Sequence, residues 1–166
     1  MITVRQIHTI KPVFNTESRV LILGTFPSVR SREEMFFYAH PRNRFWAVLA
    51  GVLGCPVPRT IQEKTSMLLE HRIALWDVVA GCEIEGSSDA RIRGVEANDL
   101  SLIIDTAPVR AVFTNGGTAH RLYRRYCLPV TGLCDTCLPS TSPANARMTQ
   151  QMLAESWSAV ARALED

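Results

Sequence analysis

Short apolar runs alternate with segments of helical spacing along this chain, and this alternation limits the possible folds more than any other feature. Residues 19–23, 73–79, 109–114 and 134–138 are the apolar runs that indicate strands. Strands separated by helices pair in parallel, and the helices then cover both faces of the sheet. We therefore predict an α/β fold, a three-layer α/β/α sandwich around a central, mostly parallel four-stranded sheet.

Helix start and stop signals lie between these strands. Apolar residues recur at helical spacing over 45–53, and Gly54 then ends the pattern. Thr60 and Glu63 form a capping-box pattern that opens a helix ending near residue 70. Further helices are expected over 100–105, after the glycine pair 116–117, and over 148–164. The polar, glycine-containing stretch 81–94 is expected to form a long loop.

Length and charge restrict the class of protein. A chain of 166 residues without an internal linker predicts one domain, residues 1–166. No signal-peptide pattern opens the chain and no apolar run could cross a bilayer, so we expect a cytoplasmic protein without a membrane partner. The net charge is only +2 and does not by itself require a nucleic-acid partner. Nothing in the sequence demands more than a monomer.

The cysteines do not indicate a disulfide framework. There are five of them, an odd number, in a chain that we expect to be cytoplasmic. Cys134 and Cys137 form a single CxxC pair, whereas a structural zinc site needs four ligands. We therefore predict no metal site, and expect Cys137 to be a small buried side chain. A metal or redox protein that uses this pair is the competing hypothesis.

Two unusual loops follow predicted strands. GTFPS (24–28) follows the first strand and LPSTSPAN (138–145) contains the end of the last one. Asp77 and Asn115 stand at the ends of the other two strands. Because parallel sheets bind ligands at the carboxyl ends of their strands, we expect these residues to line one cleft. A third run, YAHPRNRFW (38–46), places aromatic and arginine side chains beside an amide, and together with the two loops this is typical of a nucleic-acid enzyme.

Together these runs resemble the uracil-DNA glycosylase superfamily. HPRNRFW (40–46) and WDV (76–78) are more similar to its hypoxanthine-DNA glycosylase branch, family six, and the resemblance covers roughly residues 20–157. It implies a monofunctional enzyme that flips a damaged base out of DNA and hydrolyses the bond between base and sugar. The implied base is hypoxanthine, formed from adenine by deamination, and the implied partner is DNA that contains a deaminated base. No cofactor is implied.

Two positions depart from the better-known branches of this superfamily. Those branches often hold a water with an acidic or amide residue in the first loop and assist the leaving base with His or Asn in the last. Phe26 and Leu138 stand at these positions. The hypoxanthine branch is similar in lacking both, and its motif implies that Asn43 is the catalytic residue, which orients the water. Asn43 could instead cap the helix that begins near residue 44, and both roles use its side-chain oxygen.

Each remaining site residue has a second interpretation. Phe26, Phe37 and Tyr38 could stack on the flipped base or pack in the core. Asp77 could accept a hydrogen bond from N1–H of hypoxanthine, cap a turn, or pair with an arginine at 91 or 93. Asn115 could face the substrate or supply a positive φ. The full set of expected substrate-binding residues is Gly24, Thr25, Phe26, Phe37, Tyr38, Asp77 and Asn115.

A second set is expected to bind DNA. Short hydroxyls and arginines suit the phosphates beside the flipped nucleotide, and 143–147 is the expected wedge in the minor groove. Turn formation would also explain the serines and prolines. The set is Pro27, Ser28, Arg30, Arg42, Ser140, Thr141, Ser142, Pro143 and Asn145. His40 is expected to form a structural hydrogen bond beside Pro41.

The first functional hypothesis is therefore a DNA-deoxyinosine glycosylase of base excision repair. Its nearest alternative is a uracil or mismatch-specific glycosylase of the same superfamily. A module that binds damaged DNA without catalysis is the alternative from another class of protein.

Overall fold

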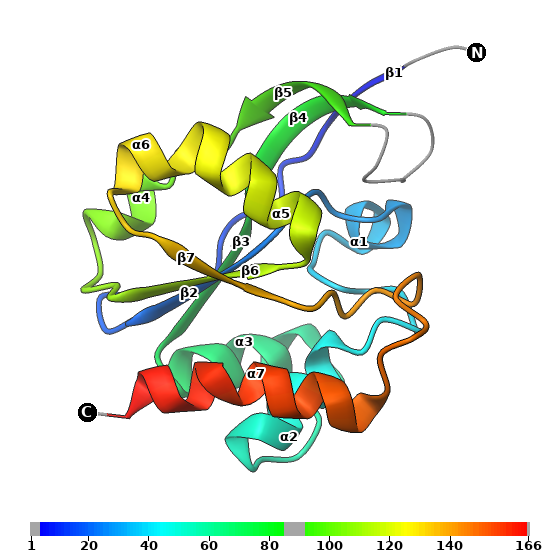
Figure 1. Cartoon of the computed structure of the whole chain (residues 1–166), viewed down its shortest axis with the longest axis vertical. Coiled ribbons are helices and arrows are strands. Elements are labelled where there is room, and N and C mark those ends of the chain that lie inside the picture. The colour runs from blue at the N-terminus through cyan, green and yellow to red at the C-terminus, as the bar shows by residue number, and fades with distance from the viewer. Residues whose placement is uncertain (1–3, 85–91, 166) are drawn as a thin grey trace.

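Figure 1 shows the computed structural model, which describes residues 4–84 and 92–165. Within this described part, one sheet contains four parallel strands in the order β3-β2-β6-β7. Their bounds are β2 Val20–Gly24, β3 Ile73–Asp77, β6 Ala111–Asn115 and β7 Asp135–Leu138. All of β2 is buried, as expected of a strand covered on both faces. The predicted central sheet is confirmed, with strand ends displaced by no more than a few residues.

Helices cover both faces of this sheet (Figure 1). On one side α3 (Ile61–Glu70) packs on β3, and α7 (Gln150–Leu164) packs on β2 and on α2 (Phe45–Leu53). On the other side α5 (Gly117–Leu122) packs on β6 and β7. The chain continues there through a π-helical turn, η2 (Tyr123–Cys127), into α6 (Leu128–Thr131), which contacts α4 (Ser101–Ile104). The three-layer α/β/α architecture is confirmed.

A second, antiparallel sheet was not predicted. It has the order β1-β4-β5, with β1 Val4–Ile7, β4 Val79–Ile84 and β5 Arg93–Ala97. The predicted strand 73–79 therefore ends at Asp77, and β4 begins two residues later. The prediction of a loop over 81–94 was wrong at both ends, and its middle, 85–91, lies outside the described residues. Register shifts between β4 and β5 break the apolar–polar alternation that would have indicated strands.

Local capping signals are confirmed. Gly54 ends α2 in the left-handed conformation at φ 71°. The Thr60 hydroxyl accepts a hydrogen bond from the Glu63 backbone N–H at 3.0 Å, as the capping box predicted. Thr149 caps α7 in the same way, so the closing helix begins at Gln150 rather than at 148. A short helix after the first loop, α1 (Val29–Glu34), was not predicted, although Ser28 caps it.

Aromatic side chains lie in the core, but the predicted burial of Cys137 was wrong. Phe45, Trp46 and Trp76 are all buried. Cys137 and Cys134 are both exposed, because the buried face of β7 is taken by Leu138 instead. Within residues 4–84 and 92–165 no group of three His, Cys, Asp or Glu side chains could hold a metal ion. In the same residues no helix is long and apolar enough to cross a membrane.

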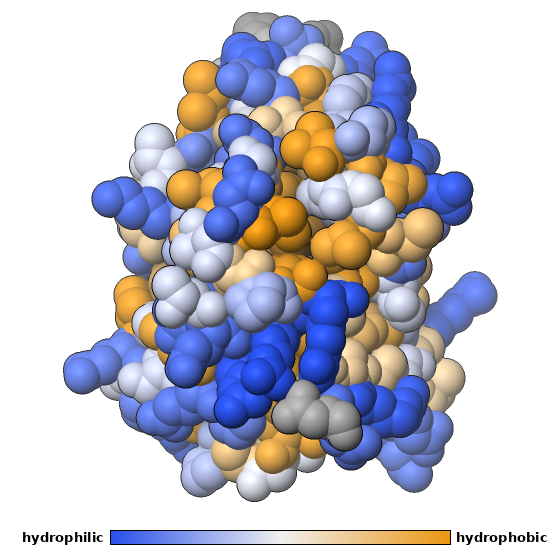
Figure 2. Space-filling view, turned by 90° about the vertical axis from the view of Figure 1, so that its left-hand side faces the viewer, coloured by the Kyte–Doolittle hydropathy of each residue, from blue (hydrophilic) through white to orange (hydrophobic). Residues whose placement is uncertain are grey.

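The side of the molecule away from the carboxyl edge of the sheet carries apolar surface. Figure 2 shows this side, where apolar side chains gather among charged ones. Both α4 and α6 lie here, with Leu102 and Val130 exposed (Figure 1). The loops singled out in the sequence lie at the opposite edge. The amino edge of the parallel sheet therefore carries exposed apolar side chains, whereas the carboxyl edge carries the loops.

Candidate active site

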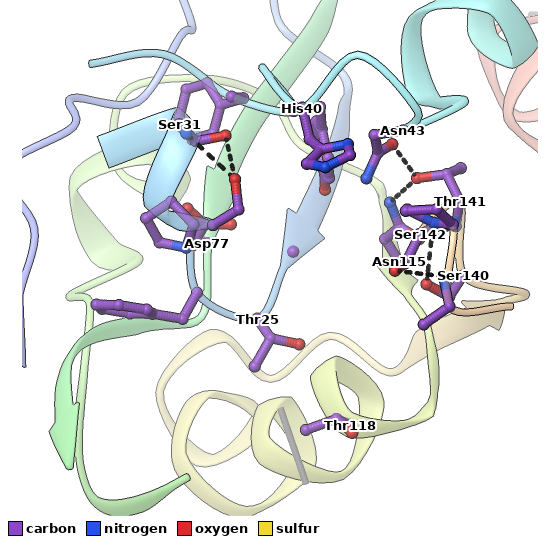
Figure 3. Close-up of a pocket in the computed structure, with 18 of the residues that line it drawn as sticks. Thr25, Ser31, His40, Asn43, Asp77, Asn115, Thr118, Ser140, Thr141 and Ser142 are labelled. Atoms are coloured by element: carbon purple, nitrogen blue, oxygen red, sulfur yellow. Dashed lines mark hydrogen bonds between the residues drawn. The ribbon is translucent and has the colours of Figure 1, made fainter. Parts of the chain in front are cut away.

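A cavity of about 930 Å³ lies at the carboxyl edge of the parallel sheet. The loop after β2, the ends of β3 and β6, and the loop after β7 form its walls (Figure 3). The walls are completed by Phe37, Tyr38, His40 and Asn43, and by Thr118 in the first turn of α5. Every residue expected to bind substrate lines this cavity, and Asn43 does so too. The topology thus brings together residues that are as far apart in sequence as Gly24 and Asn115.

Most of the residues expected to bind DNA also line the cavity: Pro27, Ser28, Ser140, Thr141, Ser142, Pro143 and Asn145. Arg30 and Arg42 do not; both are exposed, and Arg30 pairs with Glu34 at 3.2 Å. Sequence reasoning did not place Ser31, His40, Thr118 and Ala144 in the lining. Ser31, Thr118 and Ala144 could have been found, since each lies within three residues of a predicted strand-end residue or loop serine.

One wall of the cavity is a chain of hydrogen bonds through Asn115, Thr141 and Asn43 (Figure 3). The Thr141 backbone N–H donates to Asn115 Oδ1 at 3.0 Å, and Asn115 Nδ2 donates to Thr141 Oγ1 at 3.0 Å. Thr141 Oγ1 then donates to Asn43 Oδ1 at 2.9 Å. Thr141 is fully buried, so its hydroxyl is held inside the protein instead of facing a phosphate.

Asn43 also holds the start of α2. Its Oδ1 accepts a second hydrogen bond, from the Phe45 backbone N–H at 3.0 Å. A carbonyl oxygen has two lone pairs, and both are therefore used by protein donors. Within the described residues Nδ2 of Asn43 has no hydrogen-bond partner, and in Figure 3 it points away from Thr141. The oxygen end of this amide is thus used by the protein, at the Phe45 N–H and the Thr141 hydroxyl, and the nitrogen end is not.

The opposite wall is built around Gly24 and Asp77, which are paired in the sheet. A Cβ on Gly24 would lie 2.5 Å from Asp77 Oδ1 and 2.7 Å from the Tyr38 hydroxyl oxygen. Only glycine leaves room for both polar groups over the strand end. Asp77 is buried, and its backbone carbonyl accepts a hydrogen bond from Asn98 Nδ2 at 2.9 Å. Arg91, one of its expected partners, lies outside the described residues.

His8 contacts this wall at Asp77 and is a neutral imidazole. Its Nε2–H donates to the Val79 carbonyl at 2.8 Å, and its Nδ1 accepts from the Ile10 backbone N–H. Burial lowers the pKa of His8 and Arg32 lowers it further, against the opposing effect of the Val79 hydrogen bond. The contact of 3.9 Å between His8 and Asp77 is therefore not an ion pair at neutral pH.

The three candidate stacking residues differ in exposure. Phe37 is 2% exposed and belongs mainly to the core, although it reaches the cavity. Tyr38 stacks on Phe45 with ring centroids 4.1 Å apart. Its φ of 52° is unusual for a residue with a side chain and indicates backbone strain beside the cavity. Phe26 is partly exposed, meets His8 edge to face, and lies under the Arg32 guanidinium.

The loop after β7 is fixed by contacts with distant segments. Gly116 adopts a φ of 98°, and a Cβ there would lie 3.1 Å from Cβ of Ser140. The positive φ, which was one of the two interpretations of Asn115, therefore falls on the next residue. Arg44 donates to the carbonyl oxygens of Met148 and Asn145. This loop is held in place before any substrate binds.

His40 stands at the rim of the cavity. Its Nδ1 accepts a hydrogen bond from the Arg42 backbone N–H at 3.0 Å, the structural role that was expected. The ring is exposed and also lines the cavity, which leaves Nε2 for a ligand.

Comparison with known proteins agrees with this geometry. A family model described as the uracil DNA glycosylase superfamily matches residues 11–162. A protein named hypoxanthine DNA glycosylase from Methanosarcina acetivorans is 34% identical over 152 residues, which cover 90% of this chain and 94% of that protein. One of the same name from Methanosarcina barkeri is 34% identical over 107 residues, 63% of this chain and 68% of that protein.

A solved structure is also similar. It is a solution NMR structure of a Methanosarcina acetivorans protein described as a candidate uracil DNA glycosylase. The TM-score is 0.81 at 33% sequence identity, over 96% of this chain and 98% of that one. Fold, cavity and relatives together define the class of protein, which is a DNA glycosylase. The chain belongs to the uracil-DNA glycosylase superfamily.

Proposed function

We propose that this glycosylase excises hypoxanthine from DNA as the first step of base excision repair, with Asn43 as its catalytic residue. The observation that carries the proposal is the polarity of the cavity. Asp77, an acceptor, and the Nδ2 end of Asn43, a donor, lie on opposite walls (Figure 3). Hypoxanthine offers N1–H beside the acceptor O6. Adenine carries an acceptor at N1, which the Asp77 carboxylate would repel, and its donor lies at N6 instead.

The relatives support the choice of base. Both proteins named hypoxanthine DNA glycosylase share about a third of their residues with this chain over the matched regions. Phe26 and Leu138 bring no acid, amide or imidazole to the two loop positions that better-known uracil enzymes use. The similar solved structure is described as a uracil enzyme, however, and uracil also offers an N–H beside a carbonyl. Uracil is therefore the second candidate.

The DNA would lie across the rim of the cavity. Exposed Arg42 and His40 supply cationic and donor groups for phosphates on one side. Exposed Pro143 and Ala144 form the wedge that fills the gap left by the flipped base. One chain supplies the whole cavity, so we propose that the enzyme acts as a monomer.

A single-turnover excision assay tests this function. Duplexes that carry one hypoxanthine, uracil or xanthine are incubated with excess enzyme, and alkali then breaks the strand at each abasic product. We expect cleavage at hypoxanthine, and a loss of at least tenfold in rate for Asn43→Ala. Cleavage at uracil alone would replace the proposed base, and no cleavage with retained binding would indicate a module that only recognises damage.

A further inference from the structure

We infer that Asn43 acts as a hydrogen-bond donor to the departing base, and that Thr141 is the positioning residue that holds its amide in this orientation. This inference deepens the proposed function and rests on it. It replaces the sequence-based expectation that the side-chain oxygen of Asn43 orients the attacking water.

Two backbone amides fix the direction of the hydrogen-bond chain. The Thr141 N–H requires an oxygen on the facing atom of Asn115, so the other end of that amide is Nδ2, which can only donate. Thr141 Oγ1 must then accept from Asn115 and has one proton left, which it gives to Asn43. The Phe45 N–H points at the same atom of Asn43 and likewise requires oxygen there.

This polarity cannot reverse without loss of hydrogen bonds. Turning the Asn43 amide over would place an NH₂ group against the Phe45 N–H and the Thr141 hydroxyl. Thr141 is fully buried and Asn115 is 8% exposed, so water cannot replace the lost partners. Asn43 is therefore held with Nδ2 toward the cavity before substrate enters.

A donor in this position suits the leaving base better than the water. When the bond between C1′ and N9 breaks, both electrons go to the purine, and negative charge spreads over N9, N3, N7 and O6. All four atoms accept hydrogen bonds, and Nδ2 can donate to one of them as the charge develops. Water then adds to C1′, and the proton it loses ends on the released base. An amide N–H can accept no proton, so it contributes only stabilisation.

The first test replaces the donor with an acceptor. Asn43→Asp keeps one oxygen for Phe45 and Thr141 and puts a second oxygen where Nδ2 was. We expect single-turnover excision of hypoxanthine above pH 7 to be as slow as in Asn43→Ala or slower. Activity should return as the pH falls into the range where the carboxyl is protonated and can donate. Excision as fast as in the wild type at pH 8 would overturn the inference, because an acceptor would then suffice.

Asn15→Asp is the matched control. Asn15 also accepts a backbone N–H, that of Glu17, and its turn precedes β2 at the other end of the strand. The same change of amide to carboxylate there should leave the rate and its pH profile as in the wild type.

The second test removes the positioning hydroxyl. We expect Thr141→Val to lower the single-turnover rate at least tenfold without a comparable change in Kd for the duplex, and Thr141→Ser to restore most of the loss. Thr106→Val is the control, because it removes a threonine hydroxyl bonded to the Leu102 carbonyl near α4. A rate for folded Thr141→Val within twofold of the wild type would refute the role of Thr141.

A measurement without catalysis separates this inference from the proposed function. In ¹⁵N-labelled wild-type protein, one side-chain amide proton of Asn115 should exchange slowly, because it is bonded to Thr141. Both amide protons of Asn43 should exchange fast in the free protein. Protected Asn43 protons would contradict the hydrogen-bond direction even if the enzyme excised no base, and absence of excision with the expected exchange would refute only the function.

Discussion

Substitution of Gly24 by alanine should damage both the stability and the activity of this protein. The new Cβ would lie 2.5 Å from Asp77 Oδ1 and 2.7 Å from the Tyr38 hydroxyl. Real Cβ atoms do not approach other atoms so closely, so at least one of the two side chains must move. Both are held by their surroundings: Asp77 is buried, and Tyr38 stacks on Phe45.

The size of the effect follows from these contacts. Overpacking of this kind costs about 1–3 kcal/mol of unfolding free energy. At about 2–4 °C per kcal/mol for a chain of this length, Tm should fall by roughly 2–12 °C. A displaced Asp77 would also lose the hydrogen bond to N1–H of the base that we propose for it. Such a charge-assisted bond is worth about 1.5–3 kcal/mol, which lowers the excision rate by roughly 10- to 150-fold.

Thermal unfolding and single-turnover excision of hypoxanthine measure the two effects. Gly51→Ala is the matched control, because Gly51 lies in α2 and a Cβ there would meet nothing within 4 Å. That variant should gain about 0.5–1 kcal/mol from helix propensity and keep the wild-type rate. If Gly24→Ala unfolds and reacts like the wild type, the crowding that we infer over the strand end is wrong.

Three further predictions concern the fold and the DNA interface. Because the pKa of His8 is lowered in the folded protein, the unfolded chain binds a proton on this imidazole more readily. The contribution of His8 to stability is therefore complete above about pH 6.5 and is lost as the pH falls below it, by at most about 1.4 kcal/mol per pH unit. Thermal unfolding between pH 7.5 and 5 should show this loss, and His8→Gln should flatten the dependence of stability on pH. Thr60→Ala removes the cap of α3 and should cost about 1 kcal/mol in denaturant unfolding, whereas an unchanged midpoint would mean that solvent replaces the cap. Binding to a lesion duplex should weaken steeply with salt, and Arg42→Gln should reduce the slope of log Kd against log salt by about 0.9; an identical slope would remove Arg42 from the phosphate contacts.

Much of this protein could be predicted from local sequence signals. The apolar runs identified the parallel strands, and the Thr60 capping box and Gly54 marked helix ends that the structure confirms. The clustering of Asp77, Asn115 and the two loops followed from topology, because parallel strands end at one edge. The second sheet could not be predicted in this way. Its strands pair β1 with β4 across more than seventy residues, and bulges break the alternation of β4 and β5.

The sequence by itself determined which residues gather at the site, and only the tertiary structure decided what each polar atom does there. Asn43 has an oxygen and a nitrogen, and its local sequence permits either to face the substrate. The choice is made by Thr141, 98 residues away, and by the orientation that Asn115 imposes on it. The tautomer of His8 likewise depends on Val79, 71 residues away, because its carbonyl requires a proton on Nε2. A hydrogen bond has a direction that is set by both partners, so the role of a side chain is fixed only when the fold brings the second partner to it.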